Sequence, residues 1–570
     1  MNKILKKVLF SIALVVIVGG LTFYTTLPAI NVYSKGFWTF LIWLILLATA
    51  PFLFSTKNKT VKSNDSQRTY LNVDVLSVNK KFLLVFAIPI AVIIIGSISS
   101  MPLLRAKSYA SIIEVKEAVF EEDMPEVNSV SNIALMDSKS AVIIGNRALG
   151  NLSDVVSQYQ AGSTYNQINY KDAPQKVSPL EYADFFKWLN NRSAGIPGYI
   201  MVDPVNNTAN YITLEKPIHY SSSGYFGDNL TRALRFEYPT KIFGSISFEI
   251  DEDGVPFYIV SCMKPKVGLF GGLDVNEVII FNPSDKSSVI YSIDDVPAWV
   301  DIVYTGYLAS EKYNWYGTLS GGYWNSVIGN KGCKKTTDDF GYIVRDDDVW
   351  YFTGVTSVVA DESNIGFILT NARTSEYKYY SVVGAEEYSA MRAAEGEVQE
   401  KGYVASFPSL INVSGEATYI MVLKDSGGLV KLYALVNVEQ YNIVGTGTTQ
   451  EDAISNYKKL LHQNGIVGGN INIENDVKTK NITVSGVRIV QYPEDVLVYI
   501  STNQERTVYS GSIYSDEALI LINEGDTIAV RYKDTANDMI KNITSWSFVD
   551  TAPEEDPSDN IPSAPETENE

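Results

Sequence analysis

Three long apolar runs near the N-terminus constrain the fold of this 570-residue chain more than any other feature. They cover residues 8–27, 36–54 and 82–98, and none contains Asp, Glu, Lys, Arg or His. A helix needs about 20 mainly apolar residues to cross a bilayer. Pro89 lies inside the third run, and membrane helices tolerate an internal proline better than soluble helices do. The pattern predicts a membrane domain at residues 1–105 with three transmembrane helices.

The first run also has a second interpretation. Lys3, Lys6 and Lys7 ahead of an apolar stretch are typical of a signal peptide as well. The length of the run, the lack of an Ala-x-Ala motif after it and the second run close behind favour a helix that stays uncleaved. Cleavage remains an open alternative.

The distribution of basic residues predicts the orientation in the membrane. The loop between the first two runs carries only Lys35, whereas the next loop carries Lys57, Lys59, Lys62, Arg68, Lys80 and Lys81. Basic loops remain in the cytoplasm. We therefore expect a multi-pass protein of the cell membrane with a cytoplasmic N-terminus. Everything after residue 98 should lie on the extracytoplasmic side.

Charge also separates the two parts of the chain. Residues 1–107 contain 12 Lys and Arg and two Asp, whereas the remainder contains 34 basic and 63 acidic residues. Nucleic-acid binding needs clustered basic residues, so an acidic body excludes that class of partner. The bilayer itself is the first predicted partner.

The body predicts an α+β fold, in two extracytoplasmic modules at residues 106–300 and 301–465. Aromatic-led strands alternate with polar turns, for example at residues 199–213, 350–382 and 419–438. Helices are predicted at residues 178–190, with a capping box of Ser178, Pro179 and Glu181, at 384–399, and at 451–461 after Thr448. A short buried strand is predicted at residues 141–145.

In the C-terminal part, the sequence pattern predicts short strands and no helices. The segments ITVSGVRIVQY, VLVYIST, RTVYSGSIY, ALILI and DTIAVRYKD predict a small β-barrel or sandwich at residues 475–550. Residues 551–570 are acidic and proline-rich with Ile561 as the one large apolar residue, which predicts a disordered tail.

Two resemblances follow from particular stretches. The units beginning DEDGVPFYIVSCMKP and VWYFTGVTSVV resemble the strand hairpins of PepSY-type modules, whose role in the bacterial envelope is inhibition or regulation. The stretches GLFGGLDV, DVPAWVDIVY, DESNIGFILTN, GAEEYSAM and VNVEQYNIVGTG are similar to a family of large membrane proteins from Gram-positive bacteria, sometimes labelled cell-shape proteins. The second resemblance spans about residues 100–465 and implies no catalytic residues.

Candidate catalytic groups are sparse. His219 lies near Ser221, Ser222, Ser223 and Asp228, but without a G-x-S-x-G motif a histidine in a turn is the preferred interpretation. His462 ends a predicted helix, where a cation suits the helix dipole. Cys333 precedes Lys334 and Lys335, which would lower a thiol pKa. With Cys262 it forms either one disulfide or two unpaired thiols.

Two acidic clusters are candidate cation sites. Residues 251–254 (DEDG) lack the spacing of a calcium loop and predict a hairpin turn instead. Residues 346–348 (DDD) fit either a weak cation site or a charged turn. Catalytic, cofactor and metal residues are therefore predicted as none.

These observations favour a non-enzymatic binding, scaffold or regulatory protein of the cell envelope. The expected partner is a protein or peptide, and a cell-wall polymer is a further candidate. Whether it is an enzyme stays uncertain. One alternative is a hydrolase that cleaves cell-wall glycan with two carboxylates. Another is an accessory subunit of a transport or secretion complex, for which Gly19 and Gly20 are the one hint.

Overall fold

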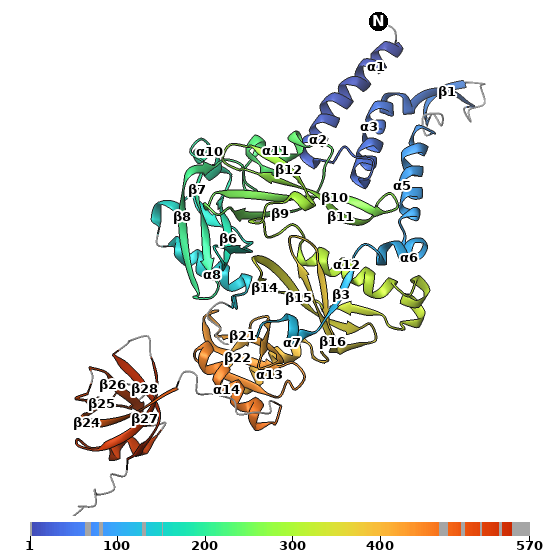
Figure 1. Cartoon of the computed structure of the whole chain (residues 1–570). Helices are drawn as coiled ribbons and strands as arrows, with labels where there is room; N and C mark the ends of the chain where they lie inside the picture. The colour runs from blue at the N-terminus through green and yellow to red at the C-terminus, as the bar shows by residue number, and fades with distance from the viewer. Residues whose placement is uncertain are drawn as a thin grey trace, which may run out of the picture. The chain divides into compact units, whose positions relative to one another are not determined.

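The computed structural model describes residues 3–62, 70–78, 84–127, 133–150, 152–466, 477–491, 496–504, 506–513, 516–534 and 539–549 (Figure 1). The chain forms two compact units, Met1–Asn464 and Gly465–Glu570. Mainly antiparallel sheets and helices make up the larger unit, and strands make up most of the described part of the smaller one. The mixed α+β class is therefore confirmed.

Two of the three apolar runs form helices long enough to cross a membrane. The first is continuous through α1 (Lys3–Leu14), the π-helical turn η1 (Val15–Gly19) and α2 (Gly20–Thr26), and the second is α3 (Lys35–Leu53). The third run forms η2 (Leu84–Phe86) and α5 (Ala87–Ser99), which meets α6 (Pro102–Ala110) at a bend of 56°. It qualifies as a third span only together with α6.

The basic loop before α5 forms a hairpin. Strands β1 (Phe54–Lys62) and β2 (Tyr70–Val78) pair antiparallel. Three of the six basic residues of this loop, Arg68, Lys80 and Lys81, lie outside the described residues. The hairpin follows the end of α3, and Figure 1 shows it away from the sheets of the larger unit.

The opposite ends of the apolar helices contact the sheets of the body. The turn after α2 is held by hydrogen bonds from Ile30 N–H to Pro239 O (2.7 Å) and from Arg235 Nε to Leu27 O (3.0 Å). At the end of α5, the Ser100 hydroxyl oxygen accepts a hydrogen bond from Phe270 N–H (2.9 Å). The C-terminal ends of α2 and α5 therefore lie on the same side, against the body.

The first two sheets of the body share one core. The first sheet has the order β4-β6-β7-β8, with β5 paired to β6, and the second is a meander in the order β12-β11-β10-β9. Trp188, Tyr199 and Phe281 are among the side chains buried between them. The elements are α8 (Ser138–Gly150), α9 (Ser153–Val156), β4 (Tyr159–Ala161), β5 (Asn166–Tyr170), β6 (Ala173–Tyr182), α10 (Phe185–Asn191), β7 (Ile196–Asp203), β8 (Thr208–Ile218), α11 (Leu230–Glu237), β9 (Ile242–Ile250), β10 (Pro256–Val267), β11 (Gly271–Phe281) and β12 (Ser288–Ser292).

The next two sheets share a second core that includes Phe352, Phe367 and Tyr419. One sheet has the order β13-β15-β16-β17-β3, with β14 on β15 and β18 on β16, and the other has the order β19-β21-β22-β23, with β20 on β21. The elements are β3 (Val115–Ala118), α7 (Phe120–Asp123), α12 (Gly306–Leu319), β13 (Lys334–Thr336), β14 (Gly341–Arg345), β15 (Asp348–Ser357), β16 (Ala360–Asn371), β17 (Tyr377–Tyr380), β18 (Gly384–Ala385), α13 (Glu387–Glu397), β19 (Val404–Ala405), β20 (Ser409–Val413), β21 (Glu416–Lys424), β22 (Val430–Asn437), β23 (Val444–Gly447) and α14 (Gln450–Gln463).

The hairpins predicted at residues 199–213, 350–382 and 419–438 are confirmed as β7–β8, β15–β16–β17 and β21–β22. Two predictions for residues 106–300 were wrong. Residues 178–182 continue strand β6, and the helix α10 begins only at Phe185, where the Asp184 carboxylate accepts hydrogen bonds from two N–H groups. Residues 141–145 belong to helix α8, not to a strand.

Helix α14 is confirmed, with a cap one residue later than predicted. The Thr449 hydroxyl, not that of Thr448, accepts the hydrogen bond from Asp452 N–H (3.1 Å). The helix predicted at residues 384–399 is shorter, because Gly384 and Ala385 pair with β16 before α13 begins.

In the smaller unit, β24 (Val477–Gln491), β25 (Val496–Thr502), β26 (Val508–Ser512), β28 (Ile540–Phe548) and β27 (Thr527–Asp534) pair in that order, and β27 pairs back to β24. Ile482, Val498, Ile500 and Tyr509 are buried among them. The predicted strand ALILI is wrong, because those residues form the 3₁₀ helix η8 (Glu517–Leu521), capped by Asp516. Strand β28 was not predicted. The tail at residues 551–570 lies outside the described residues.

Candidate binding site along strand β3

Strand β3 leads from the apolar N-terminal helices into the body. It follows α6 after a short turn and lies at the end of the sheet order, where it pairs in parallel with β17 from Tyr377↔Val115 to Tyr380↔Ala118. A strand added in parallel from a distant part of the chain joins the apolar N-terminal helices directly to a sheet of the body. It also presents that sheet's outer edge.

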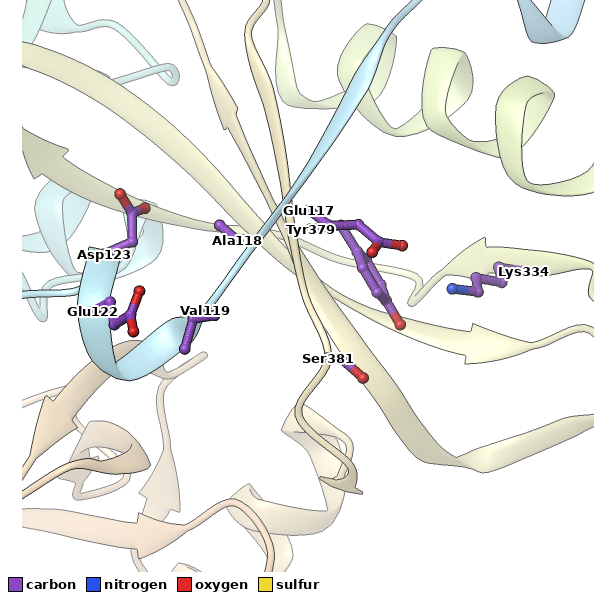
Figure 2. Close-up of a pocket in the computed structure, with 8 residues that line it drawn as sticks. All are labelled: Glu117, Ala118, Val119, Glu122, Asp123, Lys334, Tyr379 and Ser381. Atoms are coloured by element: carbon purple, nitrogen blue, oxygen red, sulfur yellow. The ribbon is translucent and has the colours of Figure 1, made fainter.

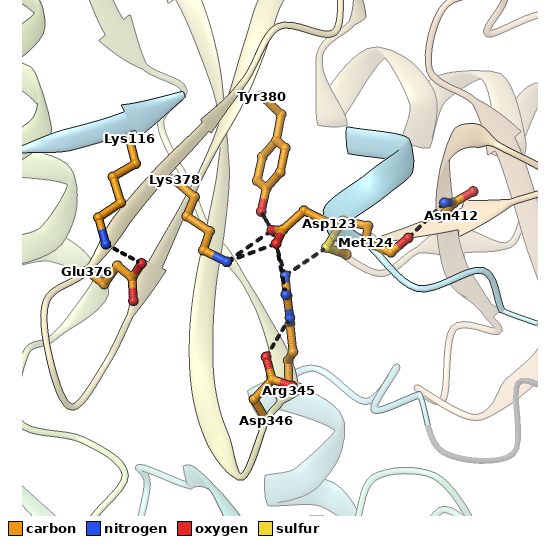
Figure 3. Close-up of polar contacts among 9 residues, drawn as sticks. All are labelled: Lys116, Asp123, Met124, Arg345, Asp346, Glu376, Lys378, Tyr380 and Asn412. Carbon is orange, nitrogen blue, oxygen red and sulfur yellow. Dashed lines mark hydrogen bonds and ion pairs between the residues drawn. The ribbon is translucent and has the colours of Figure 1, made fainter. Parts of the chain in front are cut away.

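The Asp123 carboxylate, just after β3, anchors this segment (Figure 3). It accepts hydrogen bonds from Arg345 Nη1 (2.9 Å) and Nη2 (3.1 Å), from Lys378 Nζ (3.0 Å) and from the Tyr380 hydroxyl. The Arg345 guanidinium, together with Tyr380 and Lys378, holds the pKa of Asp123 well below its usual range. Asp123 is therefore ionised at neutral pH and serves as a structural ion-pair centre.

The segment then crosses to the neighbouring sheet. The Asn412 side chain donates to Met124 O (2.8 Å), and Val127 N–H donates to Asn412 O (2.8 Å). An edge strand, a short helix and an extended turn are thus fixed to two sheets by side chains of β14, β17 and β20.

A wide, open cavity of about 730 Å³ lies beside β3 (Figure 2). A second cavity of about 280 Å³ shares Glu117, Lys334 and Tyr379 with it. Lys334 Nζ lies 4.1 Å from the centre of the Tyr379 ring. The larger cavity is lined by Glu117, Ala118, Val119, Glu122, Asp123, Lys334, Tyr379 and Ser381. Its polar and acidic lining suits a ligand that carries positive charge.

Buried carboxylates lie elsewhere in the body. The Glu249 carboxylate accepts hydrogen bonds from Asp301 N–H (2.8 Å) and Ile302 N–H (3.1 Å), and the Asp301 carboxylate accepts one from Asn169 N–H (2.8 Å). Burial raises the pKa of both carboxyls. Glu249 is 0% exposed and Asp301 is 2% exposed, so a polymer substrate does not reach them in this structure. Their contacts join three separate segments.

Glu387, at the start of α13, is a third fully buried carboxyl. One of its oxygens accepts a hydrogen bond from Gly354 N–H (2.6 Å), and the other has no partner among the described residues. Burial raises the pKa of Glu387 to about 7. Sequence patterns had not singled out any of these three acids, because burial depends on contacts between distant segments.

The serines near His219 have local structural contacts. The Ser223 hydroxyl accepts a hydrogen bond from Tyr182 N–H (2.9 Å), and the Ser222 hydroxyl donates to Glu181 (3.0 Å). Asp228 accepts from the Trp188 indole (3.1 Å), and His219 N–H donates to Pro283 O (2.9 Å). These contacts agree with a histidine in a turn. His462 lies in the last turn of α14, as expected.

The acidic clusters form turns. The Asp251 carboxylate accepts from Asp253 N–H (3.0 Å) and Val255 N–H (2.8 Å), which closes the β9–β10 hairpin. Asp346 and Asp347 have left-handed backbone angles in the β14–β15 turn, and Asp348 pairs with Arg373 (2.7 Å). Among the described residues, no group of three or more His, Cys, Asp or Glu side chains is placed to hold a metal ion.

Cys262 and Cys333 are both unpaired and buried. Burial raises the pKa of the Cys262 thiol to about 12, which disfavours the reactive thiolate. The Cys333 sulfur lies 3.5 Å from Thr318 O and 3.4 Å from Asn325 Nδ2. Of the two arrangements that the sequence allowed, the structure has two unpaired thiols.

In comparisons with known proteins, no family model matches the chain, and no curated protein matches it.

Proposed function

We propose that this chain is a membrane-anchored binding or scaffold protein whose body lies on the extracytoplasmic side. The observation that supports it is the contact of both the α2–α3 turn and the end of α5 with the body. If α1–α2, α3 and α5 each cross the bilayer, the N-terminus and the β1–β2 hairpin lie together on the opposite side. That hairpin carries Lys57, Lys59 and Lys62, and basic loops remain in the cytoplasm.

A carboxylate-dependent glycan hydrolase is the weaker candidate. Such an enzyme needs two carboxylates facing one another across an accessible cleft. The acids with the clearest burial-raised pKa values, Glu249, Asp301 and Glu387, are at most 2% exposed. Each also accepts backbone N–H groups, as expected of acids that stabilise the fold.

Gly19 and Gly20 are the sequence feature that suggests a subunit of a transport or secretion complex. A Cβ on Gly19 would lie 2.7 Å from Leu44 of α3, so this glycine serves helix packing within the chain itself. Gly20 has no neighbour within 4 Å of such a Cβ. Packing of α3 against Gly19 therefore explains this glycine without a partner protein.

The resemblances extend this proposal. We propose that the chain belongs with the large membrane proteins of Gram-positive bacteria to which residues 100–465 are similar. The PepSY-like hairpins would then have regulatory or binding roles in the envelope.

Labelling of single cysteines tests the topology. Asn210 is exposed on β8, and Thr60 lies in the β1–β2 hairpin. A membrane-impermeant maleimide applied to cells with the wall removed should label N210C before lysis, and T60C only after lysis. The buried native cysteines give the background. Labelling of T60C but not N210C on intact cells would overturn the proposal.

A further inference from the structure

We propose that β3 is an acceptor strand at which a basic, extended peptide segment of a partner adds to the sheet. The inference rests on the proposed binding function and names the surface and the class of partner. Strand addition supplies main-chain hydrogen bonds at an open edge, and neighbouring cavities select alternate side chains.

The edge of β3 is available for this pairing. Among the described residues, β3 pairs with β17 alone, and Lys116 and Glu117 are exposed. A parallel strand uses only part of its N–H and C=O groups toward one neighbour, so the others point outward. Val119, directly after the strand, is 53% exposed.

The charge around the edge is strongly acidic. Five exposed glutamates lie between residues 114 and 126: Glu114, Glu117, Glu121, Glu122 and Glu126. The one lysine of this segment, Lys116, is paired with Glu376 (3.0 Å). Asp123 is already neutralised by Arg345 and Lys378. The exposed glutamates therefore leave a surplus of negative charge that a basic segment complements.

Cavities accompany the strand along its length. A cavity of about 480 Å³ is lined by Glu114 and Lys116 at its start, and the cavity of about 280 Å³ by Val115 and Glu117. The cavity of about 730 Å³ lies at its end, beside Glu117 and Glu122. Side chains of an added strand alternate between the two faces of the sheet, so these spaces offer room for long basic side chains.

The strand is also held in place before any partner binds. The Lys116–Glu376 pair joins β3 to the residue before β17, and the Asp123 ion-pair cluster fixes the end of the segment to β14 and β17 (Figure 3). A preordered edge loses less conformational entropy on binding than a mobile one.

The test uses the full chain in nanodiscs and three fluorescent eight-residue peptides. One alternates Lys and Val, the second alternates Glu and Val, and the third is the Lys–Val peptide with N-methylated amides on one edge. We expect the Lys–Val peptide to bind, and both others to bind at least tenfold more weakly. Failure of the Lys–Val peptide to bind, or equal binding of either comparison peptide, would overturn the proposal.

Charge reversal locates the site. E117K/E122K should weaken Lys–Val binding about tenfold, because two attractive contacts become repulsive. The matched control E215K/E252K makes the same charge change on exposed residues of β8 and the β9–β10 turn, and should stay within twofold of wild type. Equal losses in both variants would contradict a site at β3.

Hydrogen exchange on the unmutated chain keeps the test independent of any folding defect. Bound Lys–Val peptide should slow exchange at the amides of residues 114–119. Unchanged exchange there, with peptide bound, would place the peptide elsewhere and refute the proposal. The cysteine-labelling result on topology does not depend on either outcome, so failure of the two proposals can be told apart.

Discussion

Asp123 and Arg345 lie 222 residues apart in the sequence and form a two-pronged ion pair, with Nη1–Oδ2 and Nη2–Oδ1 distances of 2.9 and 3.1 Å. Arg345 ends strand β14, and Asp123 ends the short helix after β3. The pair therefore fixes the segment that follows the apolar N-terminal helices to a sheet of the body. The Arg345 side chain is 16% exposed and that of Asp123 is 24% exposed, so water screens the ion pair only in part.

Replacing Asp123 with Asn should destabilise the larger unit by about 2 kcal/mol, because Arg345 and Lys378 would keep their charges in a half-buried site without a counter-charge. Chemical denaturation at pH 7, followed by tyrosine fluorescence, measures the change. The control K116A removes a far more exposed ion pair and should cost about 0–1 kcal/mol.

The pH dependence of the same variant provides a second check. The pKa of folded Asp123 lies below its unfolded value, so the stabilisation is complete above about pH 4 and is lost as the pH falls through the folded pKa. The difference between wild type and D123N should therefore be constant from pH 5 to 8. A difference that grows with pH over this range would contradict the ion-pair account.

Glu387 should make the stability of the larger unit fall as the pH rises. Its folded pKa of about 7 exceeds the ordinary value of about 4.3, so between these values the folded state holds a proton that the unfolded state has lost. The expected loss is about 1.4 kcal/mol per pH unit across this window. E387Q, which keeps an oxygen to accept from Gly354 N–H, should make the slope smaller by this amount. The part of the slope due to Glu249 and Asp301, whose pKa values burial also raises, should remain. Parallel pH profiles for the two proteins would show that Glu387 does not titrate in this way.

Sequence patterns predicted the hairpins because their information is local. In β7–β8, for example, the Asp203 carboxylate accepts from Val205 N–H (2.8 Å) and Asn206 N–H (2.9 Å), so the turn is specified by residues within it. Such a turn brings the two apolar strands that flank it side by side, so that they pair.

The failures have an equally physical reason. Ser178, Pro179 and Glu181 match a helix cap, yet Val177, Leu180 and Tyr182 are buried in β6, which pairs with β4, β5 and β7. Pairing with distant strands overrode the local preference. The short apolar run at residues 141–145 fits either a strand or a helix by periodicity alone. The Asp123 cluster lay beyond prediction, because no local pattern links it to Arg345.

Cys262 and Cys333 should remain unmodified in the folded chain, because both are buried. In an oxidising buffer the protein should migrate as the reduced species, and a maleimide should react with both thiols only after unfolding. An unreduced sample that migrates faster than the reduced one would reveal a disulfide and contradict the arrangement. C262S provides the control, since it cannot form that bond.

The contact between α5 and the body should be sensitive to a substitution at Gly96. A Cβ on Gly96 would lie 2.4 Å from the Phe270 ring, and Phe270 N–H also donates to Ser100. G96A must therefore displace Phe270, at a cost of about 1–3 kcal/mol. The β10–β11 hairpin should then open more often, and trypsin should cut faster after the exposed Lys266 in detergent. G20A adds the same methyl group to a helix where it meets nothing within 4 Å, so it should leave the rate unchanged. Equal cleavage rates in G96A and G20A would show that the body does not depend on this contact for its attachment to the third helix.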